Sequence, residues 1–339
     1  MVTQEEVARE AGTSTAVVSY VINNGPRNVS EPTRQRVLAA VAKLGYRPNA
    51  VARSLRSANT KVIGLIAADI TNPYCSQVAV EVEDAAMRHG RTLLFGNAKH
   101  DDSRQARHLR TFIEQRVEGI IFIGSAYTGD EFLPETTAVL RGENVPPIVV
   151  LDRPGHMVGA TTIQVDNQGG AHAATAHLLW HGHDEVASLS GFGELSSMRE
   201  RHQGWLDAHV ERGLTCREEW QLQSEIDRYD AYRVSRELFS RAERPRAIFT
   251  HTDEQAIGVL YAAASLGLRV PRDLAVASFD DIREACIVQP SLTTARQPIA
   301  EAARLAVDVL LCHDNGGAVV PPFMPLPTEL VVRESCGCA

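Results

Sequence analysis

The 339-residue sequence lacks the features that define several large classes of protein. No apolar run approaches the length of a membrane span, and the first six residues contain neither the basic nor the apolar segment of a secretory signal. The sequence also has no Walker loop for phosphates and no nucleophile elbow. We therefore expect a cytoplasmic protein with no membrane partner, no cofactor and no enzymatic activity.

Cysteine is scarce, and none of the six is spaced as Cys-x-x-Cys. Reduced, structural thiols are the expected state. The tail Cys336-Gly337-Cys338 could bind a metal or oxidise, but we expect a frayed C-terminus. His177 and His181 lie one helical turn apart, with His172 and His183 nearby, and such spacing can mark a metal site. A polar helix surface suffices to explain them, so no metal site is predicted.

The net charge of −8 is unevenly distributed. Residues 1–61 carry nine lysines or arginines and four acids, a net charge of +5, and the remainder carries −13. A basic head on an acidic body suggests that the head meets a polyanion and the body does not.

The first 60 residues predict short helices and no strands. Thr3-x-x-Glu6 is a capping box that opens a helix to about Ala11, and Ser14 caps a second helix from Thr15 to about Asn23. Ser30 caps a third helix that ends at Leu44. Two helices joined by a turn at Gly12 form a helix-turn-helix pattern, in which the second helix lies in the DNA major groove. From the pattern alone, a three-helix bundle with no nucleic-acid role remains equally open.

From Val62 onward, apolar strands alternate with amphipathic helices. A first series of strands begins at Val62 and a second at Thr161–Val165. This alternation predicts an α/β body of two doubly wound parallel-sheet lobes, each covered by helices on both faces. A ligand of such lobes binds beyond the carboxyl ends of the strands, in the cleft between them.

Several ordered motifs resemble the LacI/GalR family of bacterial repressors over nearly the whole chain. They include Val7-Ala8-Arg9-Glu10-Ala11-Gly12-Thr13-Ser14, Tyr46-Arg47-Pro48-Asn49, Arg201-x-x-Gly204-Trp205, Phe279-Asp280-Asp281 and Glu329-Leu330-Val331-Val332-Arg333-Glu334-Ser335-Cys336. The resemblance implies a helix-turn-helix domain at 1–48, a hinge helix and linker at 49–60, and an effector-binding and dimerisation domain at 61–339, similar to type I periplasmic binding proteins. The N-lobe would comprise about 61–160 and 290–320, and the C-lobe about 161–289 and 321–335.

The resemblance also implies a homodimer on a pseudo-palindromic double-stranded DNA operator. Its major-groove contacts would be Thr15, Ala16, Ser19, Tyr20 and Asn23, and its backbone contacts Thr3, Ser14 and Asn28. Its minor-groove and hinge residues would be Asn49, Ala52, Arg53, Leu55 and Arg56. Leu55 is an apolar wedge able to kink the duplex, and ordinary core packing is the alternative. Tyr20 stands where the family usually has an arginine, so the operator of other members does not transfer to this chain.

Family effectors are commonly sugars and sometimes purines, so the resemblance implies a small polar effector, with a sugar favoured. Polyols are held by planar, bidentate side chains. The candidate binding residues are Asp69, Tyr74, Cys75, Ser125, Asp152, Ser197, Arg201, Thr252, Asp280 and Gln297. The alternative function is an extracytoplasmic solute receptor without a DNA role, which would need a signal peptide in place of the basic helical head.

Overall fold

The computed structural model describes residues 2–23, 27–47, 60–124, 127–128, 131–152, 159–191, 195–313 and 323–338. The chain divides into two compact units, Met1–Thr60 and Lys61–Ala339, which are described separately. Within the described ranges, no helix is long and apolar enough to cross a membrane.

The first unit is built from three helices, α1 (Gln4–Glu10), α2 (Thr15–Ile22) and α3 (Glu31–Leu44). The capping box of α1 is present, because the Thr3 hydroxyl accepts from Glu6 N and the Glu6 carboxylate accepts from Thr3 N. Ser14 caps α2 by accepting from Val17 N at 3.4 Å. Ser30 precedes α3 as expected, but its hydroxyl bonds to Thr33 Oγ1 and makes no cap hydrogen bond. A small apolar core, which includes Val7, Val18 and Val37, holds the three helices together.

The second unit contains two lobes, and a six-stranded sheet forms the centre of the N-lobe. Its order is β13 (Phe323–Leu326), β7 (Thr161–Val165), β6 (Ile148–Leu151), β3 (Gly119–Ile123), β1 (Val62–Ala67) and β2 (Thr92–Asn97). All neighbouring strands are parallel. A two-stranded hairpin, β4 (Tyr127–Thr128) with β5 (Glu131–Phe132), lies outside this sheet.

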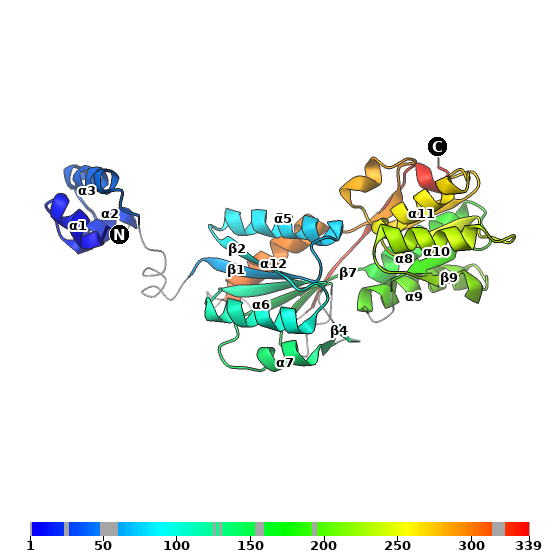
Figure 1. Ribbon diagram of the computed structural model, residues 1–339, viewed down its shortest axis with the longest axis horizontal. Helices are drawn as coiled ribbons and strands as arrows, with labels where there is room; N and C mark the ends of the chain where they lie inside the picture. Colours follow the sequence, from blue (N-terminus) through cyan, green and yellow to red (C-terminus); the bar gives the residue numbers. More distant parts are fainter. Residues whose placement is uncertain are drawn as a thin grey trace. The chain divides into compact units, whose positions relative to one another are not determined.

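Helices cover both faces of the N-lobe sheet (Figure 1). They are α5 (Pro73–Arg88) and α12 (Ile299–His313) on one face, and α6 (Asp102–Glu114) and α7 (Pro134–Leu140) on the other. Successive residues of a strand point to opposite faces. Accordingly, Leu65 packs with α5 and α12, and Ile66 packs with α6.

The C-lobe repeats this design with a second six-stranded sheet, except that one of its edge strands is antiparallel to its neighbour. Its order is β14 (Glu329–Val331), β12 (Thr293–Arg296), β11 (Ala275–Asp280), β10 (Ala247–Thr250), β8 (Ala187–Ser190) and β9 (Gln221–Gln223). Helices α8 (Asn167–Trp180) and α9 (Ser196–Glu211) pack on one face, and α10 (Arg228–Phe239) and α11 (Asp253–Ser265) on the other. Short 3-10 helices lie at Glu218–Trp220, Arg283–Cys286 and Glu334–Cys336, labelled η2, η3 and η4.

The predicted lobe boundaries are wrong for three strands. Thr161–Val165 was expected to open the C-lobe, but β7 pairs with β6 and β13 in the N-lobe sheet. Likewise, β12 lies in the C-lobe although 290–320 was assigned to the N-lobe, and β13 lies in the N-lobe although 321–335 was assigned to the C-lobe. The chain therefore crosses between lobes after β7, after β12 and after β13. Local sequence pattern indicates a strand but not the sheet that the strand joins.

The expected frayed C-terminus is also wrong. Ser335 and Cys336 are buried in η4. The Ser335 hydroxyl donates to Val276 O at 2.7 Å and accepts from Thr293 N at 2.8 Å. The last turn of the chain is therefore held against strands β11 and β12.

Candidate functional site

A pocket lies at the carboxyl ends of strands from both lobes. Its N-lobe lining is Ala68, Asp69, Asn72, Tyr74, Cys75, His100, Gly124 and Asp152, and its C-lobe lining is Leu195, Ser197, Met198, Arg201, Ile226, Thr252 and Asp280. The cavity measures about 70 Å³. Because small-molecule pockets usually occupy about 300–1,000 Å³, a ligand would need the lobes or their side chains to move apart.

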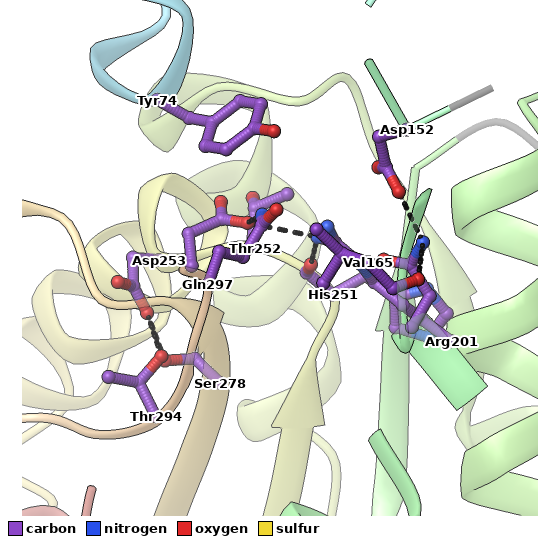
Figure 2. A network of polar contacts seen from close by, with 12 residues as sticks. Tyr74, Asp152, Val165, Arg201, His251, Thr252, Asp253, Ser278, Thr294 and Gln297 are labelled. Atoms are coloured by element: carbon purple, nitrogen blue, oxygen red, sulfur yellow. Dashed lines mark hydrogen bonds and ion pairs between the residues drawn. The ribbon is translucent and has the colours of Figure 1, made fainter. Parts of the chain in front are cut away.

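Arg201 bonds to several members of the polar network beside this pocket, and Figure 2 shows it at one side of that network, below Asp152. Its side chain is only 3% exposed, and the guanidinium lies 3.7 Å from the centre of the Phe279 ring. Nη1 donates to Asp280 Oδ1 at 3.1 Å and to the His251 carbonyl at 2.5 Å, and Nε donates to Asn167 Oδ1 at 2.8 Å. The guanidinium is thus held in one orientation by fixed partners, as a binding site requires.

Asp280 ends strand β11 and is the acidic partner of Arg201. It also accepts from Gln297 Nε2 at 2.7 Å. Burial raises the pKa of Asp280 above its usual value, and the charge of Arg201 opposes that rise. The Gln297 Oε1 atom is buried and has no hydrogen-bond partner in the described part of the chain. Its unused acceptor capacity is the kind of feature that a ligand or water satisfies.

Asp152 brings a second carboxylate to the pocket from the N-lobe. It accepts from Asn167 Nδ2 at 2.7 Å, and the same amide group donates to Glu200 Oε2 at 3.1 Å. Burial, followed by the charge of Asp152, raises the pKa of Glu200. The backbone φ is 59° at Asp152 and 120° at Asp280, a region that residues with a side chain rarely adopt. Such strain, held by the surrounding structure, is concentrated at functional sites.

Tyr74 closes the pocket from the N-lobe. It follows Asn72, which caps α5 by accepting from Tyr74 N at 2.9 Å, and its ring faces the network in Figure 2. Burial, together with the nearby Asp152 carboxylate, raises the pKa of the Tyr74 hydroxyl well above its usual value. The hydroxyl therefore stays protonated and can both donate and accept.

Of the ten residues predicted to bind an effector, eight line the pocket: Asp69, Tyr74, Cys75, Asp152, Ser197, Arg201, Thr252 and Asp280. Gln297 lies behind Asp280 and is not among the lining residues. Ser125 lies outside the described residues. Thr252 has a structural role as well, because its hydroxyl caps α11 by accepting from Gln255 N at 3.2 Å.

Two polar residues that organise the network were not predicted from the sequence. Asn167 is 1% exposed and bonds to Arg201, Asp152 and Glu200. His251, whose carbonyl accepts from Arg201, is fully buried, and burial lowers the pKa of its ring well below the usual value. The available signal was positional, because Asn167 follows β7 and His251 follows β10, where strands end at the cleft.

In the first unit, the residues expected to contact DNA lie along α2 and at the ends of the helices, and most of them are exposed. Thr15, Ala16 and Asn23 are exposed, and Ser19 and Tyr20 are half-buried. The Asn23 amide donates to both the carbonyl and the hydroxyl of Ser19, so the two polar groups are already paired. Thr3, Ser14 and Asn28 are exposed, and the first two cap helix N-termini, which favour phosphate. The hinge residues Asn49, Ala52, Arg53, Leu55 and Arg56 lie outside the described residues.

Comparison with known proteins identifies the family. Residues 3–49 match the description "Bacterial regulatory proteins, lacI family", and residues 175–336 match "Periplasmic binding protein-like domain". The chain is 35% identical over 312 residues to the HTH-type transcriptional repressor PurR of Erwinia tasmaniensis, covering 92% of this chain and 90% of that protein. It is 34% identical over 342 residues to the repressor of the same name from Glaesserella parasuis, covering 99% and 98%. The chain belongs to the lacI family of bacterial regulatory proteins.

Solved structures of this family agree with the fold. The lac repressor dimer bound to operator and the anti-inducer ONPF has a TM-score of 0.87 and 26% identity, with 99% of each chain covered. The transcriptional regulator CelR in complex with cellobiose has a TM-score of 0.70 and 27% identity, covering 99% of this chain and 100% of that one. The LacI-family chain described here is therefore a DNA-binding transcriptional repressor with a periplasmic-binding-protein-like domain, as its motifs predicted.

Proposed function

We propose that a small polar effector in the pocket controls the affinity of this repressor for a pseudo-palindromic operator, and that the chain acts as a homodimer. The observation that carries this proposal is the buried cluster of Arg201, Asp152 and Asp280 between the lobes. Buried charges are costly unless they are paired and hydrogen-bonded. A pocket lined by one guanidinium and three carboxylates, those of Asp69, Asp152 and Asp280, is therefore suited to a ligand rich in hydroxyl or amide groups.

A sugar or sugar derivative is the effector class that these side chains favour. Carboxylates accept from vicinal hydroxyls, and a guanidinium donates to their oxygens in a fixed fork. CelR, a structural relative, was solved with cellobiose, which supports a sugar for this pocket. A purine is the second candidate, because Tyr74 offers a ring for stacking and Asp280 an acceptor for ring N–H groups.

The proposed coupling runs from the lobes through the hinge to the DNA. An effector changes operator affinity only by binding the two states of the repressor with different affinities. Thr15, Ala16 and Tyr20 would read the major groove, and Leu55 would enter the minor groove. Induction and corepression use the same parts, so the sign of the response is an outcome of the experiment.

The effector test uses Asn167→Ala, which removes the amide that joins Arg201 to Asp152. Sugars and purine bases are screened by calorimetry on the intact chain, and each hit is tested for its effect on the gel shift of a DNA fragment from beside the gene. We expect Asn167→Ala to weaken the binding of a true effector by about tenfold or more, because hydrogen bonds to charged groups are lost. Arg91→Met, at a partly buried N-lobe ion pair with Glu118 whose residues do not line the pocket, is the control and should bind normally.

A hit that binds Asn167→Ala as tightly as the natural sequence, or that leaves operator affinity unchanged, would contradict the proposed site.

DNA binding itself is tested without effector. Leu55→Ala should weaken operator binding roughly tenfold, because the wedge no longer holds the base step apart. Arg9→Ala on α1 is the comparison. Losing one surface charge should lower the affinity for all duplexes alike and leave the preference for operator intact. Unchanged operator affinity for Leu55→Ala would remove the wedge from the mechanism.

A further inference from the structure

Two histidines and two cysteines from opposite ends of the C-lobe sequence meet at one point. His177 lies in the last turn of α8 and His181 is its C-cap, so the two imidazoles lie on one face of the helix. Cys336 ends η4 and Cys338 follows it, about 160 residues later in the chain. His177 and Cys336 are separated by 159 positions, so no local motif joins the two pairs.

The four ligand atoms, two imidazole nitrogens and two sulfurs, all lie within 4.8 Å of one another. His177 Nε2 is 3.2 Å from Cys336 Sγ and 3.4 Å from Cys338 Sγ, and His181 Nε2 is 2.9 Å from Cys338 Sγ. In a tetrahedral zinc site, metal–sulfur bonds of about 2.3 Å and metal–nitrogen bonds of about 2.0–2.1 Å place neighbouring ligand atoms about 3.3–3.8 Å apart. The cluster needs only shifts of a few tenths of an ångström, up to about 1 Å for the widest pair, to reach that geometry.

We propose that His177, His181, Cys336 and Cys338 bind one Zn²⁺ ion that fastens the C-terminus of the chain to helix α8. Two imidazoles and two thiolates form a Cys₂His₂ set, whose softness and geometry select zinc over calcium or magnesium. On binding, each cysteine loses its thiol proton to solvent and forms a zinc–sulfur bond, while each neutral imidazole donates a nitrogen lone pair. Two thiolates neutralise the charge of the ion, so its burial is not opposed by an excess charge.

The surrounding backbone holds the ligands in place without help from the metal. Ser335, next to Cys336 in η4, bonds to Val276 O and Thr293 N, and Cys336 is 1% exposed. Gly337 has a φ of 97°, and this turn brings Cys338 back beside Cys336. A side chain at Gly337 would strain that conformation. Four protein ligands complete the coordination sphere, so the site is structural and leaves no position for a substrate.

The test uses the full-length chain without an affinity tag, because a histidine tag would itself bind metal. We expect purified protein to carry about one Zn²⁺ per chain, and the chelated protein to take up Co²⁺ with the visible bands of a tetrahedral ion and a thiolate charge-transfer band. Zinc should raise the Tm of the chelated protein by roughly 5–10 °C, since it binds the folded state alone.

Cys338→Ser and His181→Gln should lose the cobalt bands and the zinc-dependent rise in Tm. Cys286→Ser and His183→Gln are the matched controls, because both residues lie in the C-lobe outside the cluster, and both variants should bind as the natural sequence does. Gly337→Ala keeps all four ligands, so its weakened cobalt binding would show that the turn, and not side-chain loss alone, forms the site.

The proposal is overturned if the natural sequence takes up no stoichiometric zinc, or if its cobalt spectrum lacks thiolate absorption. It is also overturned if peptide mass spectrometry shows a Cys336–Cys338 disulfide in protein purified under reducing conditions. Should Cys338→Ser fail to fold, the cobalt spectrum of the natural sequence and of Gly337→Ala still decides the question.

Discussion

The two lobes share one strand order but are filled with different chemistry. Read from β2 and from β9, both sheets place the second strand at the edge, then the first, third, fourth and fifth, with a sixth from the C-terminal segment. The N-lobe strands β1, β3 and β6 bury aliphatic residues on both faces. The C-lobe strands bury polar residues such as Ser188, Thr250, Ser278 and Thr294. One scaffold therefore supports a mainly aliphatic core in one lobe and, in the other, an apolar core that also buries a network of polar side chains.

The difference shows where the binding chemistry is built. Asp253 is a fully buried carboxylate of the C-lobe that does not line the pocket. It accepts from Thr294 Oγ1 at 2.8 Å, from Ile282 N at 2.8 Å and from the Ser278 hydroxyl. Burial raises the pKa of Asp253, and the nearby Asp280 carboxylate adds to that rise. The three hydrogen bonds to Asp253 fix the strand ends and the helix start beside the pocket, so we expect the C-lobe to hold its pocket residues in place.

The largest expected effect is a loss of stability when the arginine of one ion pair in each lobe is replaced. Arg201→Met leaves Asp280 buried without its partner, so we expect the free energy of unfolding to fall by about 3–5 kcal/mol, together with loss of effector binding. Arg91→Met, at the N-lobe pair with Glu118, removes an arginine that is 24% exposed, so we expect a smaller loss of about 1–2 kcal/mol.

Urea unfolding followed by tryptophan fluorescence reports the C-lobe, because all three tryptophans, at 180, 205 and 220, lie there. Circular dichroism follows both lobes in the same samples. Equal losses in the two variants would show that the C-lobe depends on its buried ion pair no more than the N-lobe depends on the Arg91–Glu118 pair.

A smaller loss of stability is expected when a tightly packed glycine in each lobe is replaced by alanine. A Cβ on Gly204 of α9 would meet the Gln168 carbonyl and lie 2.8 Å from His172 N, both backbone atoms of α8. A Cβ on Gly64 of β1 would meet the Phe112 ring, a side chain that can rotate. We therefore expect Gly204→Ala to cost about 3 kcal/mol and Gly64→Ala about 1 kcal/mol, measured as changes in urea unfolding. The reverse order would mean that α8 and α9 can separate easily.

The smallest effect concerns pH and the buried histidines of the C-lobe. The His209 ring accepts from Val186 N at 3.3 Å and contacts Trp205 O at 2.9 Å, so its buried surroundings suit the neutral imidazole. Burial lowers the pKa of His209. The unfolded chain therefore binds a proton at this histidine more readily than the folded chain does. The contribution of His209 to the free energy of unfolding is present above a pH of about 6.5 and is lost as the pH falls below it.

His209→Gln keeps an acceptor for Val186 N but does not titrate. We expect it to lower stability at pH 7.5 and to reduce the slope of stability against pH between about 7 and 5. Tryptophan fluorescence in urea at a series of pH values measures that slope. An unchanged slope would assign the acid sensitivity of the C-lobe to other groups, such as His251.

Local features of this protein were predictable from sequence because they depend on neighbouring residues. The capping box at Thr3, the cap at Ser14 and strands β3, β6, β7 and β10 follow from hydrogen bonds and side-chain periodicity within a few positions. Asp280 and Arg201 were placed at the pocket because a strand end and a family motif located them. These inferences needed no knowledge of the packed fold.

The tertiary structure alone decided which distant segments meet. Strand β7 joins the N-lobe, Asn167 links Arg201 to Asp152, and the chain end turns back onto α8 beside His177 and His181. A strand of Thr161–Val165 has the same local pattern in either sheet, and Cys336 and His181 have no pattern in common at all. Local propensity acts over a turn or a strand, whereas these meetings follow from the burial of whole faces across the fold, which sequence spacing does not encode.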